Sequence, residues 1–257
     1  MTVLGFSHIV TEIRDFEKSI SYYEKLGYSV EYEISQVVPD EKRSVLNQNP
    51  SEVHLYYLRH KKSPRIGIEL IKHNESSEGK RAKNIAHGWS FADSQVSLAK
   101  DPDENALIEF PYLGKGPKQH LFIPTSKFQE SLDFYTNVFS LKLLKGSGDF
   151  GHNYKELYQN FGQFAVLTLR SCLSPNWNLA LHLVETEKEQ EEIHLNETGF
   201  SCFCLLINQA EFARFQEMDL DMIGPLVGEK KVKEKVAQFR FGFIRDPNHY
   251  LVEYYLS

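Results

Sequence analysis

The sequence contains an internal repeat, and this repeat limits the folds that are open to the chain. Four residues recur unchanged after an interval of 112 positions: His8, Phe16, Ser19 and Tyr23 reappear as His120, Phe128, Ser131 and Tyr135. After one inserted residue, segment 68–71 aligns with segment 181–184 in the same way. Because a chance alignment seldom keeps its register over about sixty residues, we interpret the two segments as copies of one structural unit.

Shorter similarities extend the repeat to four units. Residues 199–202 copy residues 5–8, with cysteine in place of histidine. Two Asp-Pro turns, at Asp101 and Asp246, are each followed by a strand pattern that ends in glutamate. The units lie near residues 4–75, 84–112, 118–186 and 198–257. The second unit is too short for a helix and three more strands, so we predict only three strands in it.

Each complete unit shows the pattern of a strand, a helix and three further strands. In the first unit Phe16, Ile20 and Tyr23 fall on one face of a helix, and Asp15 is placed to cap its N-terminus. Ser126 has the corresponding capping position in the third unit. Strand patterns follow at residues 28–34, 53–59 and 65–72, and again at 141–144, 164–170 and 177–184.

These features together resemble the vicinal oxygen chelate superfamily. The resemblance is carried by the strand histidine, the helix that ends in S-x-x-F/Y-Y, and the final strand with its Asp-Pro turn and glutamate. This superfamily includes glyoxalase I, extradiol ring-cleaving dioxygenases, and the fosfomycin- and bleomycin-resistance proteins. The resemblance implies an α+β fold in which repeated βαβββ modules pair into two open, cup-shaped mixed sheets with helices outside. We expect an N-terminal module pair at residues 1–113 and a C-terminal module pair at 114–257.

The resemblance also implies metal ligands on the first and last strand of each module. Carried over by position, it gives a metal site in the N-terminal half that consists of His8, Glu69, His87 and Glu109. A second, weaker site in the C-terminal half would consist of His120, His182, Cys202 and Glu253. Imidazole and carboxylate donors suit Zn²⁺, Fe²⁺, Mn²⁺ or Ni²⁺, so we expect a divalent metal cofactor.

The sequence leaves the pairing of the modules open. We place the better site in the N-terminal half, because only that half keeps a complete His/Glu/His/Glu set. If unit two instead pairs with unit three, one site would consist of His87, Glu109, His120 and His182. Cys202 lies in a nearly continuous apolar run at residues 200–207, which is typical of a strand covered on both faces. We therefore expect Cys202 to be a packed, reduced thiol.

The function implied by the resemblance is that of a metal-dependent enzyme acting on a small substrate with two vicinal oxygens. The bound ion would act as a Lewis acid or activate O₂. The residues do not decide between a lyase or isomerase and a ring-cleaving dioxygenase, and they assign no catalytic residue. The alternative is a metal-free protein that binds a small aromatic or antibiotic-like ligand. The short second unit and the changed donors in the C-terminal half favour that alternative.

Composition restricts the partners of the chain. Its 257 residues include 29 Lys and Arg against 35 Asp and Glu, which gives a net charge of −6 and no basic footprint for nucleic acid or an anionic membrane. No apolar run in the sequence approaches the ~18 residues of a membrane span. Because Glu12, Arg14 and Asp15 interrupt the N-terminus before an apolar region can form, we expect no signal peptide. Three cysteines argue against a disulfide framework. We expect a cytoplasmic monomer or homodimer that binds a small molecule.

Overall fold

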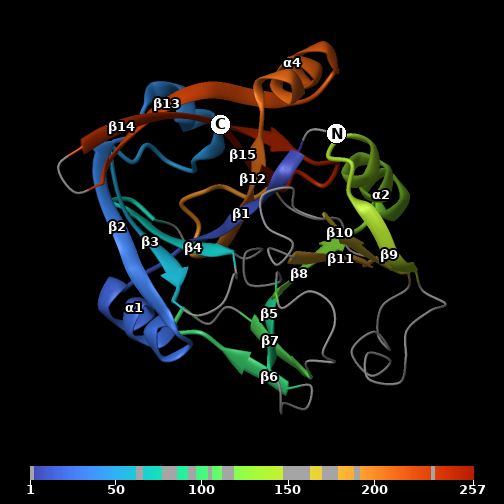
Figure 1. The fold of residues 1–257 in the computed structure, drawn as a ribbon, viewed down its shortest axis with the longest axis horizontal. Helices are drawn as coiled ribbons and strands as arrows, with labels where there is room; N and C mark the ends of the chain where they lie inside the picture. Colours follow the sequence, from blue (N-terminus) through green and yellow to red (C-terminus); the bar gives the residue numbers. More distant parts are fainter. Residues whose placement is uncertain are drawn as a thin grey trace.

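The chain folds into two β-sheets with helices on the outside, as the computed structural model in Figure 1 shows. The structure describes residues 3–61, 66–76, 86–91, 97–103, 106–111, 119–146, 163–169, 179–187, 192–232 and 235–257. This architecture is the α+β fold with repeated modules that the sequence predicts.

The larger sheet is built from units one and four. Unit one contributes β1 (Val3–Glu12), β2 (Tyr28–Val37), β3 (Glu52–His60) and β4 (Gly67–His73). Unit four contributes β12 (Gly199–Ile207), β13 (Met222–Val232), β14 (Lys235–Arg245) and β15 (Leu251–Leu256). The strand order is β13-β14-β15-β12-β1-β4-β3-β2. The sheet curls so strongly that its edge strands β2 and β13 approach each other (Figure 1).

The smaller sheet is built from units two and three. Unit two contributes β5 (Ala86–Phe91), β6 (Ser97–Lys100) and β7 (Ala106–Pro111). Unit three contributes β8 (Gln119–Thr125), β9 (Lys142–Gly146), β10 (Phe164–Thr168) and β11 (Leu179–Glu185). The strand order is β6-β7-β5-β8-β11-β10-β9. Within its described residues, unit two has the three strands predicted for it.

The modules therefore pair as one with four and two with three. In each sheet the first strands of two units meet antiparallel, β1 with β12 and β5 with β8. β1 and β12 are buried along almost their whole length and form the centre of the larger sheet, with a strand on each side of the pair. Each sheet takes strands from both sides of the boundary predicted near residue 113, so the sheets do not follow the predicted division into 1–113 and 114–257.

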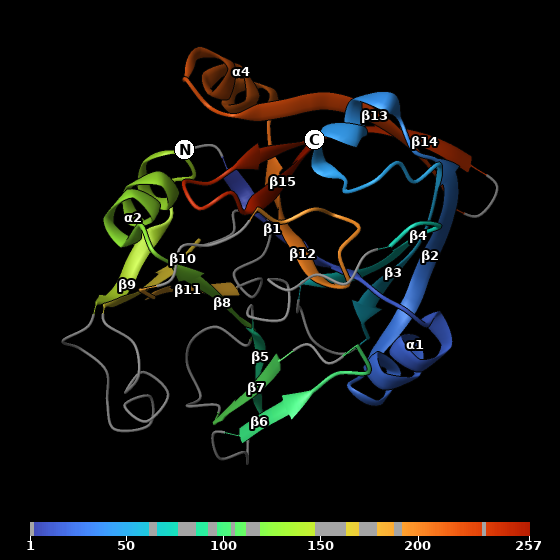
Figure 2. The ribbon, with the colours of Figure 1, turned by 180° about the vertical axis from the view of Figure 1, so that it is seen from behind.

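The helices lie at the periphery of the molecule (Figure 2). Those that lie within the described residues are α1 (Phe16–Lys25), α2 (Phe128–Asn137) and α4 (Gln209–Glu217). Asp15 caps α1 as predicted, since its Oδ1 accepts a hydrogen bond from the backbone N–H of Lys18 at 3.1 Å. The cap predicted at Ser126 is wrong: Lys127 holds that position, and Thr125 Oγ1 accepts the Lys127 N–H at 3.1 Å instead. Within the described residues, no helix is long and apolar enough to cross a membrane.

The Asp-Pro turns of units two and four each accept a hydrogen bond from the helix of the preceding unit. Asp103, in unit two, accepts a hydrogen bond from Ser19 Oγ on α1 at 2.8 Å. Asp246, in unit four, accepts one from the Tyr135 hydroxyl on α2 at 3.0 Å. These repeated turns thus join unit one to two and unit three to four across the two sheets, which gives the motif a structural role.

The two faces of the larger sheet have different surroundings. Its outer face packs on the helices in one large apolar cluster that contains Ile9 and Phe203. Its concave inner face carries a separate cluster that contains Val10 and Cys202. A 3₁₀ helix, η1 (Asp40–Val45), lies against β13 and adds Val45 to this inner cluster. Because strand side chains alternate between faces, His8 and Glu69 lie on the concave side.

Candidate metal centre

Three polar side chains from three strands meet on the concave face of the larger sheet. His8 Nε2 on β1 lies 3.1 Å from Oε2 of Glu253 on β15 and 3.7 Å from Oε2 of Glu69 on β4. His8 is 2% exposed and Glu253 is 6% exposed, so water screens the electrostatic interaction between them only weakly. On the opposite side of the imidazole, Nδ1 lies 2.9 Å from the hydroxyl of Ser7, which orients the ring.

Cys204 completes this group from the central strand β12. It lies directly opposite His8 in the antiparallel β1–β12 register and beside Glu253 in the parallel β12–β15 register. Ligand atoms of His8, Cys204 and Glu253 all lie within 4.8 Å of one another, and all three residues are buried. Three adjacent strands therefore present a nitrogen, a sulfur and an oxygen at one level of the sheet.

Aromatic rings from both modules surround His8. Tyr57 on β3 and Tyr255 on β15 contact the imidazole edge-on, with ring centroids 5.5 and 5.9 Å away. Tyr32 stacks on Tyr57, and Phe239 stacks on Tyr255, each at 4.9 Å. The two pairs of stacked rings form walls on either side of the polar group.

Tyr57 reaches His8 across a glycine. Gly67 pairs with His8 in the parallel β1–β4 register, and a Cβ atom at residue 67 would collide with the ring of Tyr57. Glycine is therefore required at this position by the close approach of the ring rather than by its backbone angles.

The electrostatics of the site are dominated by burial and by the two carboxylates. Burial raises the pKa of the Cys204 thiol well above its usual range, and Glu253 raises it further. Burial also raises the pKa of Tyr57 to about 12. The pKa of Tyr255 is raised by burial and then by Glu69 and Glu253. The phenols of Tyr57 and Tyr255 and the thiol of Cys204 are therefore neutral at pH 7.

This donor set fits a divalent metal ion. Two carboxylates that share a largely buried space repel each other, and a cation between them removes that cost. The imidazole Nε2 is directed at the carboxylates while Nδ1 is held by Ser7, which is the usual arrangement of a metal-binding histidine. Nitrogen, sulfur and carboxylate oxygen are the donors that Zn²⁺ takes in proteins.

The sheet pairing divides both of the predicted ligand sets. His8 and Glu69 come together as predicted, but His87 and Glu109 lie on β5 and β7 of the other sheet, where their side chains are outside the described residues. Glu253 takes their place beside His8. The grouping of ligands predicted from the sequence is corrected accordingly. Unit one shares its sheet with unit four, through β1 and β12, and not with unit two, its neighbour in the chain.

His120 and His182, from the second predicted set, form a pair in the smaller sheet. Their ring nitrogens Nδ1 and Nε2 lie 2.9 Å apart, on β8 and β11. Burial lowers the pKa of His120 to about 3, and it lowers the pKa of His182 as well. The structure thus separates these histidines from Cys202 and Glu253, which lie in the larger sheet.

Cys202 is a buried, reduced thiol, as predicted. Cys204, in contrast, was not among the predicted ligands. The pairing of first and last strands shows which residues of units one and four are equivalent. Val10 pairs with Glu69 in unit one, and Cys204 pairs with Glu253 in unit four. Val10 therefore corresponds to Cys204, and His8, two positions earlier, corresponds to Cys202. In an antiparallel pair, however, repeat equivalents do not face each other, and the residue opposite His8 is two positions further along. The sequence feature that could have indicated Cys204 is its spacing of two from Cys202, which places both thiols on the same face of the strand.

Comparisons with known proteins support this reading of the fold. No protein-family model and no curated protein sequence matches the chain. Glyoxalase I from Zea mays has a similar structure, with a TM-score of 0.63 and 14% identity over 98% of this chain and 92% of that chain. A protein from Bacillus subtilis that is provisionally named a dioxygenase is similar with a TM-score of 0.60 and 10% identity, over 99% of this chain and 85% of that chain. At this level of identity the similarity shows a shared fold: the chain has the α+β fold of these proteins, with its modules paired into two sheets.

Proposed function

We propose that this protein is a divalent-metal-dependent enzyme of the vicinal oxygen chelate superfamily, with its active site on the concave face of the larger sheet. The observation that supports this most is the approach of Glu253 and Glu69 to the same nitrogen of His8, at 3.1 and 3.7 Å. His8, Cys204 and Glu253 would hold the ion. Glyoxalase I, which has this fold, is an enzyme, and the proposal extends that property to this chain.

The thiol of Cys204 favours a zinc-like ion over iron. A soft sulfur donor suits Zn²⁺, whereas the oxygen chemistry of an Fe²⁺ dioxygenase would oxidise an adjacent thiolate. The site therefore supports lyase or isomerase chemistry better than ring cleavage. A bound divalent ion would supply Lewis-acid stabilisation of negative charge on two vicinal substrate oxygens.

Glu69 is the candidate for the proton-transfer step. It lies near His8 but outside the three-residue group, and its side chain, at 12% exposure, is the most accessible of the acidic groups at the site. A carboxylate in this position can take a proton from a substrate carbon next to a carbonyl and return it to the neighbouring carbon. The aromatic walls formed by Tyr57 and Tyr255 would exclude water from that transfer.

Metal analysis and a proton-exchange assay test the proposal. The protein purified after zinc supplementation should contain about one zinc ion per chain, and His8→Ala should lose it. His54→Ala is the matched control, because His54 lies on the outside of β3, where its Nδ1 bonds to Ser35 Oγ. With a panel of 2-hydroxy carbonyl compounds in D₂O, deuterium incorporation should require Glu69 and be lost in Glu69→Gln.

The competing interpretation predicts different results. A metal-free binding protein would contain no zinc, manganese, nickel or iron after supplementation, and it would bind aromatic ligands equally well with and without His8. Oxygen consumption with catechols, in place of deuterium incorporation, would instead favour the dioxygenase class. Either result would overturn the proposed chemistry.

A further inference from the structure

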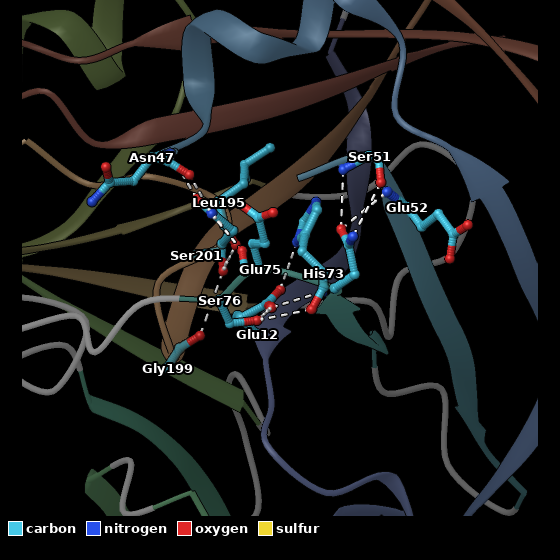
Figure 3. Close-up of polar contacts among 12 residues, drawn as sticks. Glu12, Asn47, Ser51, Glu52, His73, Glu75, Ser76, Leu195, Gly199 and Ser201 are labelled. Carbon is cyan, nitrogen blue, oxygen red and sulfur yellow. Dashed lines mark hydrogen bonds and ion pairs between the residues drawn. The ribbon is translucent and has the colours of Figure 1, made fainter. Parts of the chain in front are cut away.

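A second buried polar cluster lies on the same concave face, where β1 and β4 end, away from the candidate metal centre. Figure 3 shows this cluster. Glu12 Oε2 lies 2.9 Å from His73 Nδ1, and Glu12 Oε1 accepts the backbone N–H of His73 at 2.8 Å. Both side chains are fully buried. Glu12 lies four positions after His8, and His73 lies four positions after Glu69, which corresponds to about 13 Å along a strand. The two clusters are therefore distinct.

The other ring nitrogen of His73 has no hydrogen-bond partner among the described residues, although it is buried. Because Nδ1 faces a carboxylate, which can only accept, the ring proton resides on Nδ1 and Nε2 presents a lone pair. Burial lowers the pKa of His73 and keeps the ring neutral. Buried polar atoms without a partner are rare in folded proteins, and one that is held in place by a carboxylate indicates a missing donor.

Lys42 supplies a positive charge above this cluster. It lies on η1, is only 8% exposed, and its ammonium makes no hydrogen bond or ion pair with any residue that the structure describes. Its charge contributes to lowering the pKa of His73, after burial, so the two groups are close enough to interact. Lys42 therefore contributes a positive charge near the His73 ring.

The segment that carries Lys42 is fixed over His73. Asn196 Oδ1 accepts the backbone N–H of Asn47 at 2.7 Å, and Asn196 Nδ2 donates to the carbonyl of Glu75 at 2.9 Å. Leu195 N–H also donates to the carbonyl of Val45 at 2.8 Å. In the view of Figure 3, Asn47, Leu195 and Glu75 lie on one side of the Glu12–His73 pair. These bonds hold η1 in place over this end of the concave face.

We propose that Lys42 and His73 form a binding site for an oxyanion that also carries a hydroxyl group, such as a hydrogen phosphate or a 2-hydroxy carboxylate. The anionic oxygen would accept from the Lys42 ammonium, and the hydroxyl would donate to His73 Nε2. Glu12 is a positioning residue that fixes the ring. The cationic Lys42 excludes a second metal ion here. The inference that the bound oxyanion is part of the substrate rests on the proposed function. The binding site itself does not depend on that function.

The experiment uses protein stripped of metal with EDTA, so that its result is independent of the metal centre. Inorganic phosphate, glycolate and acetate are titrated separately at pH 7, and the ring nitrogens of His73 are followed by NMR. Phosphate or glycolate should shift these signals, and acetate, which has no hydroxyl donor, should bind at least about tenfold more weakly than glycolate. Lys42→Met should weaken binding at least about tenfold. Lys18→Met is the matched control, because Lys18 is on the surface.

Three results would overturn the site: no response of His73 to phosphate or glycolate, equal affinity in wild type and Lys42→Met, or equal affinity for glycolate and acetate. Lys42→Arg should retain binding, which separates loss of charge from loss of packing. Oxyanion binding in a protein that fails to bind zinc would remove the proposed function and leave this site intact. Zinc binding without oxyanion binding would remove this site and leave the proposed function intact.

Discussion

His8 and Glu253 lie 245 positions apart in the sequence, and their side chains meet at 3.1 Å in the larger sheet. This contact joins the first strand of unit one to the last strand of unit four. It exists because β1 and β12 pair at the centre of the sheet, with β15 as the next strand. The candidate metal centre is therefore a product of the module pairing and belongs to neither half of the chain alone.

The two neighbouring cysteines should differ in their effect on zinc. Cys204→Ser should weaken zinc binding at least about a hundredfold, since changes to groups outside the ligand shell already cost 10- to 100-fold. Cys202→Ser is the matched control, because Cys202 is equally buried but lies outside the three-residue group. Competition with a chromogenic chelator measures both affinities. Equal losses in the two variants would remove Cys204 as a ligand.

The buried His120–His182 pair should make the protein sensitive to acid. The folded state lowers the pKa of both rings, to about 3 for His120, so the unfolded chain binds more protons below its ordinary histidine pKa near 6.5. The contribution of the neutral histidine pair to the free energy of unfolding is thus complete above pH 6.5. It is lost as the pH falls from 6.5 toward 3. The loss is up to about 1.4 kcal/mol per pH unit for each proton.

Urea unfolding at pH 7.5, 6.5 and 5.5 measures this slope. The variant in which both His120 and His182 are replaced by leucine should have a shallower dependence on pH. His54→Ala, which removes an exposed histidine, should leave the dependence unchanged. A double variant with the slope of the wild type would show that other groups are responsible.

Asp246 should be important for stability. Its carboxylate accepts the Tyr135 hydroxyl at 3.0 Å and the backbone N–H groups of Asn248 and Tyr250 at 2.8 Å. Asp246→Ala removes this shared acceptor from three buried donors and should cost about 3 kcal/mol of unfolding free energy. Asp40→Ala removes an exposed aspartate and should change the unfolding free energy by less than about 0.5 kcal/mol. A cost below 1 kcal/mol for Asp246→Ala, from urea unfolding, would contradict the structural role of the turn.

Gly67 should tolerate no side chain while Tyr57 is present. The methyl group of Gly67→Ala collides with the Tyr57 ring, and the strain should cost about 1–3 kcal/mol and displace Tyr57 from His8. Combining Gly67→Ala with Tyr57→Ala should recover part of that cost, and thermal unfolding of the four proteins measures the coupling. Strictly additive effects would show that the two residues do not compete for space.

The sequence by itself determined the units of this protein and much of their internal structure. The positions of Phe16, Ile20 and Tyr23 predict α1, and the alternation of apolar residues predicts strands that the structure contains. The repeat also placed His8 on the first strand of its unit, and Glu69 and Glu253 at equivalent positions on the last strands of theirs. These features are local: a helix face or a strand pattern depends on residues within a few positions of each other.

The tertiary structure alone decided which units share a sheet, and with it the composition of the candidate site. Either pairing would have buried the same apolar central strands, so the hydrophobic pattern could not distinguish the pairings. The choice is made by contacts between distant residues, such as β1 against β12. Their register brings Cys204, not its repeat-equivalent neighbour Cys202, opposite His8. The same packing placed Lys42 above His73, because η1 is fixed by residues near 195 that no local pattern connects to it.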